Sequence, residues 1–235
     1  MASLYLNPML ATATVGSTVV LEGEDARHAR TVARTRVGER LSIGNGRGLV
    51  VHGEVVGLDP FELRVESVLD VARPTPELWL VQALAKGDRD EMAVQAATEL
   101  GASGIVPWAA DRSVSRWDAA KAEKGRTRWE AIVREAGKQS IRPWVPEVQP
   151  VHSAKQVAAL GTVLVLDPVA DLRLSEVALP TEGRIHLVVG PEGGIPEHEF
   201  ATLGGTRVRL GTEVLRTSTA GPAAIAVLNL RLGRW

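Results

Sequence analysis

Residues Leu187–Gly194 read LVVGPEGG, and this apolar run followed by a glycine-rich loop indicates the fold of the C-terminal part of the chain. The apolar residues Ile185–Val189 predict a buried strand, and the glycines after it let the backbone turn sharply and approach a ligand closely. A second predicted strand, Arg207–Leu210, also runs into a glycine, in Gly211-Thr212. Ligands bind beyond the carboxyl ends of the strands in open parallel sheets. The two loops therefore predict a ligand site, although plain tight turns would have the same composition.

Several familiar site signatures are missing from the sequence. Neither glycine loop continues into the Gly-Lys-Ser/Thr of a P-loop or matches the dinucleotide fingerprint Gly-x-Gly-x-x-Gly. No Gly-x-Ser-x-Gly elbow of a hydrolase occurs. The absence of cysteine excludes disulfides, thiolate zinc sites and a cysteine nucleophile. The histidines show no metal-ligand spacing: they are His28, His52, His152, His186 and His198. We therefore expect no metal.

Strands and helices alternate from Glu77 to the C-terminus. Apolar runs predict strands over Leu78–Ala85, Ile105–Ala109, Thr162–Leu166, Arg184–Val189 and Arg207–Leu210. Helices are predicted over Asp88–Leu100 with Asp88 as the N-cap, over Trp117–Gln139, in a short segment at Pro196, and over Ser218–Leu230. Such alternation implies an α/β fold with an open, mostly parallel sheet that helices cover on both faces.

The N-terminal part has a different pattern, in which short strands surround one helix. Strands are predicted over Thr18–Leu21, Arg40–Ile43, Gly48–Val56 and Phe61–Val68, with a helix over Glu24–Thr35. Closely spaced short strands indicate a small β-barrel. The segment Ala72–Pro76 (ARPTP) cannot continue a sheet or a helix. We therefore predict a barrel over residues 1–72, a linker over 73–77 and the α/β domain over 78–235.

Bulk composition places the chain among ordinary globular proteins. It has 235 residues, of which 45% are hydrophobic and 23% charged. No apolar run approaches the roughly 20 residues that span a bilayer, so no membrane role is expected. The start, MASLYLNPML, lacks the basic and apolar regions of a secretory signal. These features favour a cytoplasmic location.

The net charge of −1 hides two basic stretches. Arg27–Arg47 contains six arginines and one acid, and Arg112–Arg142 contains nine basic residues and four acids. Such stretches could contact a phosphate backbone or be solvated helix faces.

Taken together, the motifs of the chain resemble the ribosomal RNA small-subunit methyltransferase E family, of the trefoil-knotted SPOUT class. The resemblance covers essentially the whole sequence. It is carried by Leu187–Gly194, by Leu210–Thr219 (LGTEVLRTST), by Lys86–Gly101 (KGDRDEMAVQAATELG) and, in the predicted barrel, by His28–Gly38 (HARTVARTRVG). It implies a PUA-like, RNA-binding β-barrel followed by a SPOUT domain with a deep trefoil knot.

The resemblance also implies an activity. It is the S-adenosylmethionine-dependent methylation of N3 of a specific uridine in 16S ribosomal RNA, within the small subunit and by a homodimer. Uracil N3 carries a proton and is a poor nucleophile until that proton leaves. A nearby arginine can stabilise the negative charge that develops on the base. Arg216 is the first candidate for this role, and Lys86, Arg89 and Arg112 are the second choices.

The same resemblance implies which residues bind the cofactor and the RNA. The expected cofactor site consists of Leu166, Val189, Gly190, Pro191, Glu192, Gly193, Gly194, Leu210, Gly211, Leu215, Arg216, Thr217 and Ser218. The expected RNA contacts are Arg27, His28, Arg30, Arg34, Arg36 and Arg47.

Two positions depart from the family pattern. The family usually has an arginine where this chain has Glu213, and a glutamate where it has Ser218. Three alternatives therefore stay open. They are a non-catalytic RNA-binding relative that has lost methyl transfer, another RNA-base methyltransferase of the same class, and a nucleotide-dependent enzyme with an unknotted, doubly wound fold.

Overall fold

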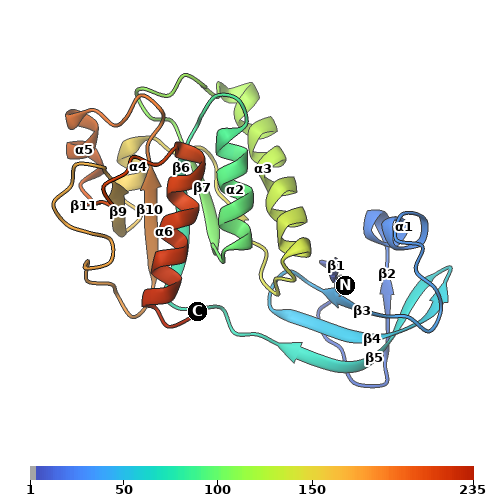
Figure 1. The fold of residues 1–235 in the computed structure, drawn as a ribbon. Helices are drawn as coiled ribbons and strands as arrows, with labels where there is room; N and C mark the ends of the chain where they lie inside the picture. Colours follow the sequence, from blue (N-terminus) through green and yellow to red (C-terminus); the bar gives the residue numbers. More distant parts are fainter. Residues whose placement is uncertain (1–3) are drawn as a thin grey trace. The chain divides into compact units, whose positions relative to one another are not determined.

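The computed structural model describes residues 4–235, and the chain divides into two units (Figure 1). One comprises the N-terminal residues through Arg73 together with Gly137–Val145. The other comprises Pro74–Ala136 and Pro146–Trp235. The first crossing between them falls inside the proline-containing segment Ala72–Pro76. The return of Gly137–Val145 to the N-terminal unit was not predicted.

The N-terminal unit is a five-stranded half-barrel. The strand order is β1 (Leu4–Leu6), β3 (Arg40–Gly44), β4 (Leu49–Leu58), β5 (Phe61–Asp70) and β2 (Thr18–Leu21). β1 and β3 are parallel, and the other neighbours are antiparallel. Side chains alternate along β5, where Phe61, Leu63 and Val65 are buried in the core. The period of two follows from the pleat of a strand.

The helix of this unit is shorter than predicted. α1 covers Gly23–Thr31 and does not extend to Thr35. The amides of Val32 and Ala33 both donate to the carbonyl of His28, and Arg34 adopts φ 53, in the left-handed region. A left-handed residue after the last turn is a common way to end a helix. The residues after Thr31 therefore form an exposed loop.

The second unit contains a six-stranded sheet in which all neighbours are parallel, as predicted. The strand order is β11 (Thr206–Val208), β9 (Thr162–Leu166), β10 (Arg184–Val189), β6 (Glu77–Ala83), β7 (Gly104–Trp108) and β8 (Glu147–Val148). Its helices are α2 (Arg89–Glu99), α3 (Ala119–Gln139, which ends in the other unit), α4 (Ala154–Ala158), α5 (Glu197–Leu203) and α6 (Thr217–Arg231).

Helices cover both faces of this sheet. Trp79 and Val81 of β6 share one buried cluster with Val157 of α4 and Leu203 of α5. Residues of even number in β6 point to the opposite face, where α2 and α6 pack side by side (Figure 1). A Cβ on Gly221 of α6 would lie 2.7 Å from Leu80 Cδ1, so α6 approaches the sheet closely. Its small residues thus serve packing within the chain.

Two local predictions need correction. Asp88 stands at the N-cap of α2, but it has φ 58 and its side chain makes no capping hydrogen bond. Asp90 instead accepts hydrogen bonds from the amides of Ala85, at 3.0 Å, and Glu91, at 2.9 Å. The last strand, β11, ends at Val208 and not at Leu210. Leu210 therefore belongs to the loop that follows. In the described part of the chain, no helix is long and apolar enough to cross a membrane.

Candidate active site

The loop after β10 has a conformation that requires glycine at two positions. A Cβ on Gly190 would lie 2.8 Å from Ile195 Cγ1, closer than van der Waals contact allows. Gly194 has φ 72, and its amide donates to the carbonyl of Pro191 across 2.9 Å to close the turn. Only glycine adopts such a φ without strain. Trp108 Nε1 anchors the start of the loop by donating to the Val189 carbonyl at 3.0 Å.

The start of α6 is tied to this loop by one side chain. Thr217 Oγ1 donates to the Gly190 carbonyl at 3.0 Å. The same oxygen accepts a hydrogen bond from Nε2 of Gln82, in β6, at 2.9 Å. Both Thr217 and Gln82 are buried. The two predicted loops therefore meet at the carboxyl end of the sheet.

A cavity of about 550 Å³ lies where these segments meet. Its volume is in the range typical of small-molecule sites. The predicted residues that line it are Arg89, Leu166, Val189, Gly190, Pro191, Glu192, Gly194, Leu210, Gly211, Leu215, Arg216 and Thr217. Residues drawn from β9, β10, α2 and the loop before α6 thus converge on one space.

Four predicted site residues do not line this cavity. Arg112 Nη1 donates to the Gly193 carbonyl at 3.1 Å, so both residues take part in a loop contact. Ser218 is buried in the first turn of α6. Lys86 is exposed in the loop between β6 and α2.

Two lining residues that sequence reasoning missed follow directly after β9. They are Asp167, which is buried, and Pro168. Asp167 forms an ion pair with Arg207, whose Nη2 lies 2.6 Å from Oδ2. Arg207 also pairs with Glu197 at 2.8 Å. The rule that ligands bind at strand ends could have found Asp167, because it immediately follows a predicted strand.

Of the charged side chains around the cavity, some have an ionic partner in residues 4–235 and others have none. Arg89 Nη1 and Glu192 Oε1 form an ion pair at 3.0 Å. Arg216 and Glu213, both exposed, form no side-chain hydrogen bond or ion pair within residues 4–235. Arg216 is the N-cap residue of α6. A cation at a helix N-terminus is unfavourable unless an anion is also present, so this end of the cavity favours an anionic group.

Comparisons with known proteins agree with the fold and the cavity. Residues 73–229 match the model of the RNA methyltransferase domain, and residues 21–66 match that of the RNA methyltransferase PUA domain. The ribosomal RNA small subunit methyltransferase E of Mycobacterium bovis is 40% identical over 94% of this chain and 89% of its own length. This chain belongs to the ribosomal RNA small subunit methyltransferase E family.

Two further members of the family are less similar in sequence. The Bacillus subtilis protein is 31% identical over 90% of each chain. The crystal structure of the Neisseria gonorrhoeae protein, bound to S-adenosyl methionine, has a TM-score of 0.85 to this chain. It is 29% identical and covers 98% of both chains. The expected α/β catalytic unit and N-terminal PUA domain are thereby confirmed.

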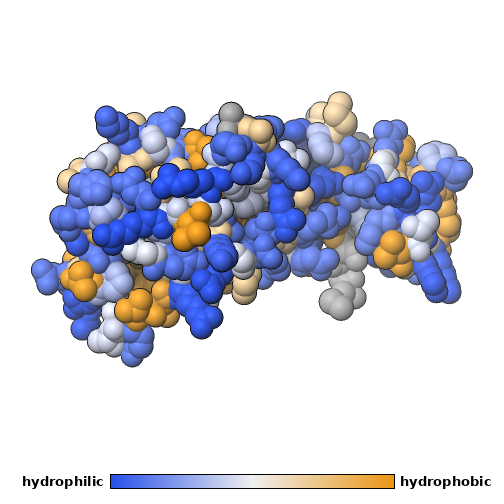
Figure 2. Space-filling model, turned by 90° about the horizontal axis from the view of Figure 1, so that it is seen from above, coloured by the Kyte–Doolittle hydropathy of each residue, from blue (hydrophilic) through white to orange (hydrophobic). Residues whose placement is uncertain are grey.

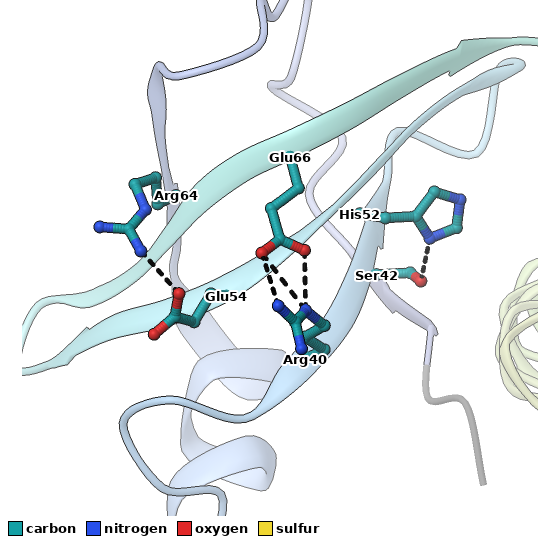
Figure 3. A network of polar contacts seen from close by, with 6 residues as sticks. All are labelled: Arg40, Ser42, His52, Glu54, Arg64 and Glu66. Atoms are coloured by element: carbon teal, nitrogen blue, oxygen red, sulfur yellow. Dashed lines mark hydrogen bonds and ion pairs between the residues drawn. The ribbon is translucent and has the colours of Figure 1, made fainter.

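In the PUA unit of this protein, more arginine side chains are paired with acidic residues than the sequence suggests. Arg27 lies 3.5 Å from Glu24, Arg30 pairs with Asp59 at 3.1 Å, and Arg40 binds Glu66 through two nitrogens. Figure 3 shows the Arg40–Glu66 pair, which spans from β3 to β5, beside the Arg64–Glu54 pair of the neighbouring strands β5 and β4. These ion pairs offset much of the positive charge of the first basic stretch.

The remaining predicted RNA contacts are more available. Arg34 and Arg36 are exposed and form no side-chain hydrogen bond or ion pair in the part of the chain that the structure describes. Arg47 donates to the Pro8 carbonyl at 2.8 Å and is also exposed. His28 is exposed, with its ring centroid 6.1 Å from that of Tyr5.

Part of the second basic stretch is a solvated face of α3. Arg126 pairs with Glu123 at 2.9 Å and with Glu130 at 2.8 Å along α3. Arg128 pairs with Glu91 of α2. Lys138, by contrast, is largely buried in an ion pair with Asp25 at 2.8 Å. These ion pairs offset part of the positive charge of the stretch. Hydrophilic residues dominate the face drawn in Figure 2, with apolar residues in small separate groups.

Proposed function

We propose that this protein methylates N3 of a uridine in the 16S ribosomal RNA of the small subunit, with S-adenosylmethionine as the methyl donor. Membership of the family supports a ribosomal RNA methyltransferase. The cavity at the carboxyl ends of β9 and β10 is the observation that carries the proposal, because the Neisseria gonorrhoeae relative was crystallised with S-adenosyl methionine. The assignment of N3 as the methylated atom rests on the sequence resemblance to the family.

The cavity fits such a cofactor chemically. Leu166, Val189 and Leu215 supply apolar surface for an adenine ring. Gly190 also lines the cavity and, having no side chain, presents only its backbone there. Glu213, which has no ionic partner in residues 4–235, places a carboxylate on the lining for a cationic ligand, whereas Asp167 is already paired with Arg207. When bound, the cofactor supplies an electrophilic methyl group.

Arg216 is proposed as the group that favours the reactive form of the base. The proton on uracil N3 must pass to a proton acceptor before that nitrogen can attack the methyl group, and the negative charge then spreads over the two carbonyl oxygens of the uracil. Arg216 lines the cavity and has no anionic partner in the described residues, so it is free to bind that charge. Arg89 is already paired with Glu192, and Arg112 donates to the Gly193 carbonyl.

The PUA unit is proposed to supply affinity for RNA. Arg34 and Arg36 project from the loop after α1 without acidic partners in residues 4–235. Free guanidinium groups bind phosphates and release counterions. We expect Arg27 and Arg30 to contribute less, because Glu24 and Asp59 already neutralise them.

We also propose that the protein acts as a homodimer, as the resemblance implies, and in the cytoplasm, as its composition favours. Met92 of α2 and Leu230 of α6 are 59% and 65% exposed, and these helices are neighbours. Single exposed apolar side chains are common on protein surfaces, so the resemblance is what supports a homodimer. Sedimentation equilibrium would test the stoichiometry, and a monomer at micromolar concentration would contradict it.

The decisive experiment uses small subunits from a strain that lacks this methyl group. The purified protein and labelled S-adenosylmethionine should modify a single uridine, and mass spectrometry of RNA fragments should locate the methyl on N3. A methyl on another base would support a different methyltransferase of the same class. Cofactor binding without transfer to any RNA, or no cofactor binding, would support the non-catalytic relative.

A further inference from the structure

Gln82 is a polar residue in an otherwise apolar part of the sheet. It lies in β6, whose sequence ELWLVQA is buried from Leu78 to Ala83. Its exposed fraction is 0%, and it pairs in register with Val189 of β10 and Pro107 of β7. Burial of an amide is costly unless its polar atoms are hydrogen-bonded. The residue therefore needs an explanation beyond packing.

The hydrogen bonds of Gln82 lead to the cavity. Nε2 donates to Thr217 Oγ1 at 2.9 Å and to the Ala83 carbonyl at 3.2 Å. The Thr217 hydroxyl has one proton, which it donates to the Gly190 carbonyl at 3.0 Å. The hydroxyl can therefore only accept from Gln82, which fixes the amide with its nitrogen toward Thr217. A continuous chain runs from the sheet through α6 to the cavity loop.

This chain joins segments that are distant in sequence. Gln82 and Thr217 are 135 residues apart, and Thr217 and Gly190 are 27 apart. Thr217 directly follows Arg216, and Gly190 begins the glycine loop; all three line the cavity. A shift of Thr217 would therefore move both the arginine and the loop. Sites that must hold a ligand precisely need such support from the residues behind them.

Fold stability does not account for the amide. Gln82 Oε1 is buried and has no hydrogen-bond partner in the described part of the chain. An acceptor left unsatisfied in the interior destabilises the folded state. An apolar side chain of similar size would avoid this penalty. The unsatisfied Oε1 of the amide is thus unfavourable for folding, whereas its Nε2 donates to Thr217.

We propose that Gln82 is a positioning residue for the cofactor site, acting through the Thr217 hydroxyl on Gly190 and on the start of α6. The inference rests on the proposed function, because it assumes that the cavity binds S-adenosylmethionine. Gln82 lines no part of the cavity and touches no reacting atom. Its effect is therefore on the geometry of residues that do line it.

The test compares Gln82→Met, Thr217→Val, Thr217→Ser and the double variant Gln82→Met/Thr217→Val. Thr98→Val is the matched control, because Thr98 is a buried threonine whose hydroxyl donates to Val94 within α2. Calorimetry gives the Kd for S-adenosylmethionine, steady-state kinetics give kcat and KM, and thermal unfolding gives the Tm of each variant.

Gln82→Met and Thr217→Val should each weaken cofactor affinity about tenfold, the effect of losing one well-placed hydrogen bond. The Tm of Gln82→Met should be unchanged or higher. The double variant should be no weaker than either single variant, because the chain is already broken. Thr217→Ser, which keeps the hydroxyl, should bind more tightly than Thr217→Val, and Thr98→Val should change only the Tm.

Native affinity in Gln82→Met, additive losses in the double variant, or losses that follow the Tm would overturn the inference. If Gln82→Met does not fold, the contrast between Thr217→Val and Thr217→Ser decides the role of the hydroxyl, and equal affinities reject the chain. A native protein that does not bind S-adenosylmethionine would instead reject the proposed function.

Discussion

Arg89 and Glu192 form an ion pair of 3.0 Å between residues 103 positions apart in the sequence. The pair connects the first residue of α2 to the glycine loop after β10, and both side chains line the cavity. Their side chains are 45% and 30% exposed, so the pair contributes little to stability. Its consequence is electrostatic, because it neutralises two of the charges at the cavity. Arg216 has no such partner in the described residues.

Arg216→Ala should reduce turnover on ribosomal subunits by about 10²–10³-fold, the effect of losing one preorganised charge donor. Arg216→Lys should restore little activity, because an ammonium does not reproduce the planar guanidinium. Arg89→Ala is the matched control at the same cavity and should reduce turnover much less, since Glu192 already neutralises Arg89. The kcat of each variant on unmethylated small subunits is the measurement. Full activity in Arg216→Ala, with native Tm, would remove Arg216 from the mechanism.

Gly190→Ala should abolish measurable cofactor binding, because its Cβ would stand 2.8 Å from Ile195 Cγ1 and displace the loop. Gly193→Ala is the comparison within the same loop. Its Cβ would lie 3.1 Å from Arg112 Cβ, and Gly193 does not line the cavity. Calorimetry should therefore show a smaller loss for Gly193→Ala. Equal losses would show that the whole loop, and not Gly190 in particular, shapes the site.

Replacing Arg34 and Arg36 with alanine should weaken RNA binding and flatten its salt dependence. Each lost phosphate contact lowers the slope of log K against log salt concentration by about 0.7–0.9. The control pair Arg27→Ala/Arg30→Ala removes the same formal charge but breaks the ion pairs with Glu24 and Asp59. Its salt slope should change less. Titrations of 16S RNA at several salt concentrations test this, and identical slopes for both pairs would contradict the assignment.

His186 should make the stability of the second unit sensitive to acid. Burial lowers the pKa of His186 from 6.5 to about 4, and its ring lies against Trp79 with centroids 5.9 Å apart. The unfolded chain therefore binds a proton that the folded chain excludes between these values. Stability is fully present above about pH 6.5 and falls as the pH drops toward 4, by up to about 1.4 kcal/mol per pH unit.

His186→Phe is the variant that isolates this effect, because it keeps an aromatic ring beside Trp79 and cannot titrate. Between pH 7 and pH 5 the native protein should lose about 2 kcal/mol of unfolding free energy relative to this variant. Urea unfolding at the two pH values measures the difference. A constant gap between native protein and variant would show that His186 does not titrate differently on folding.

The sequence alone predicted five of the six strands of the sheet in the second unit, together with the loops that line the cavity. The apolar runs Thr162–Leu166 and Arg184–Val189 match β9 and β10 residue for residue. Such runs are readable because a strand buried on both faces is apolar at most of its positions. The glycine loop after β10 was readable for a similarly local reason, since its φ values and close contacts exclude side chains at Gly190 and Gly194.

Short elements were beyond the reach of sequence reasoning. β1 has three residues, β8 two and α4 five. A periodic pattern needs more residues than these to be recognised. Their positions come from contacts with neighbours, as when β8 pairs with β7 through Glu147 and Val148.

Tertiary structure alone decided which charges and polar groups act together. Six arginines in Arg27–Arg47 looked equivalent, but Arg30 meets Asp59 and Arg40 meets Glu66 only after the strands pair. Gln82 likewise carried no pattern of its own. Gln82 reaches Thr217 across 135 residues because β6 and α6 pack together in the folded unit. Local patterns report burial and turns, whereas the partners of a polar side chain depend on long-range packing.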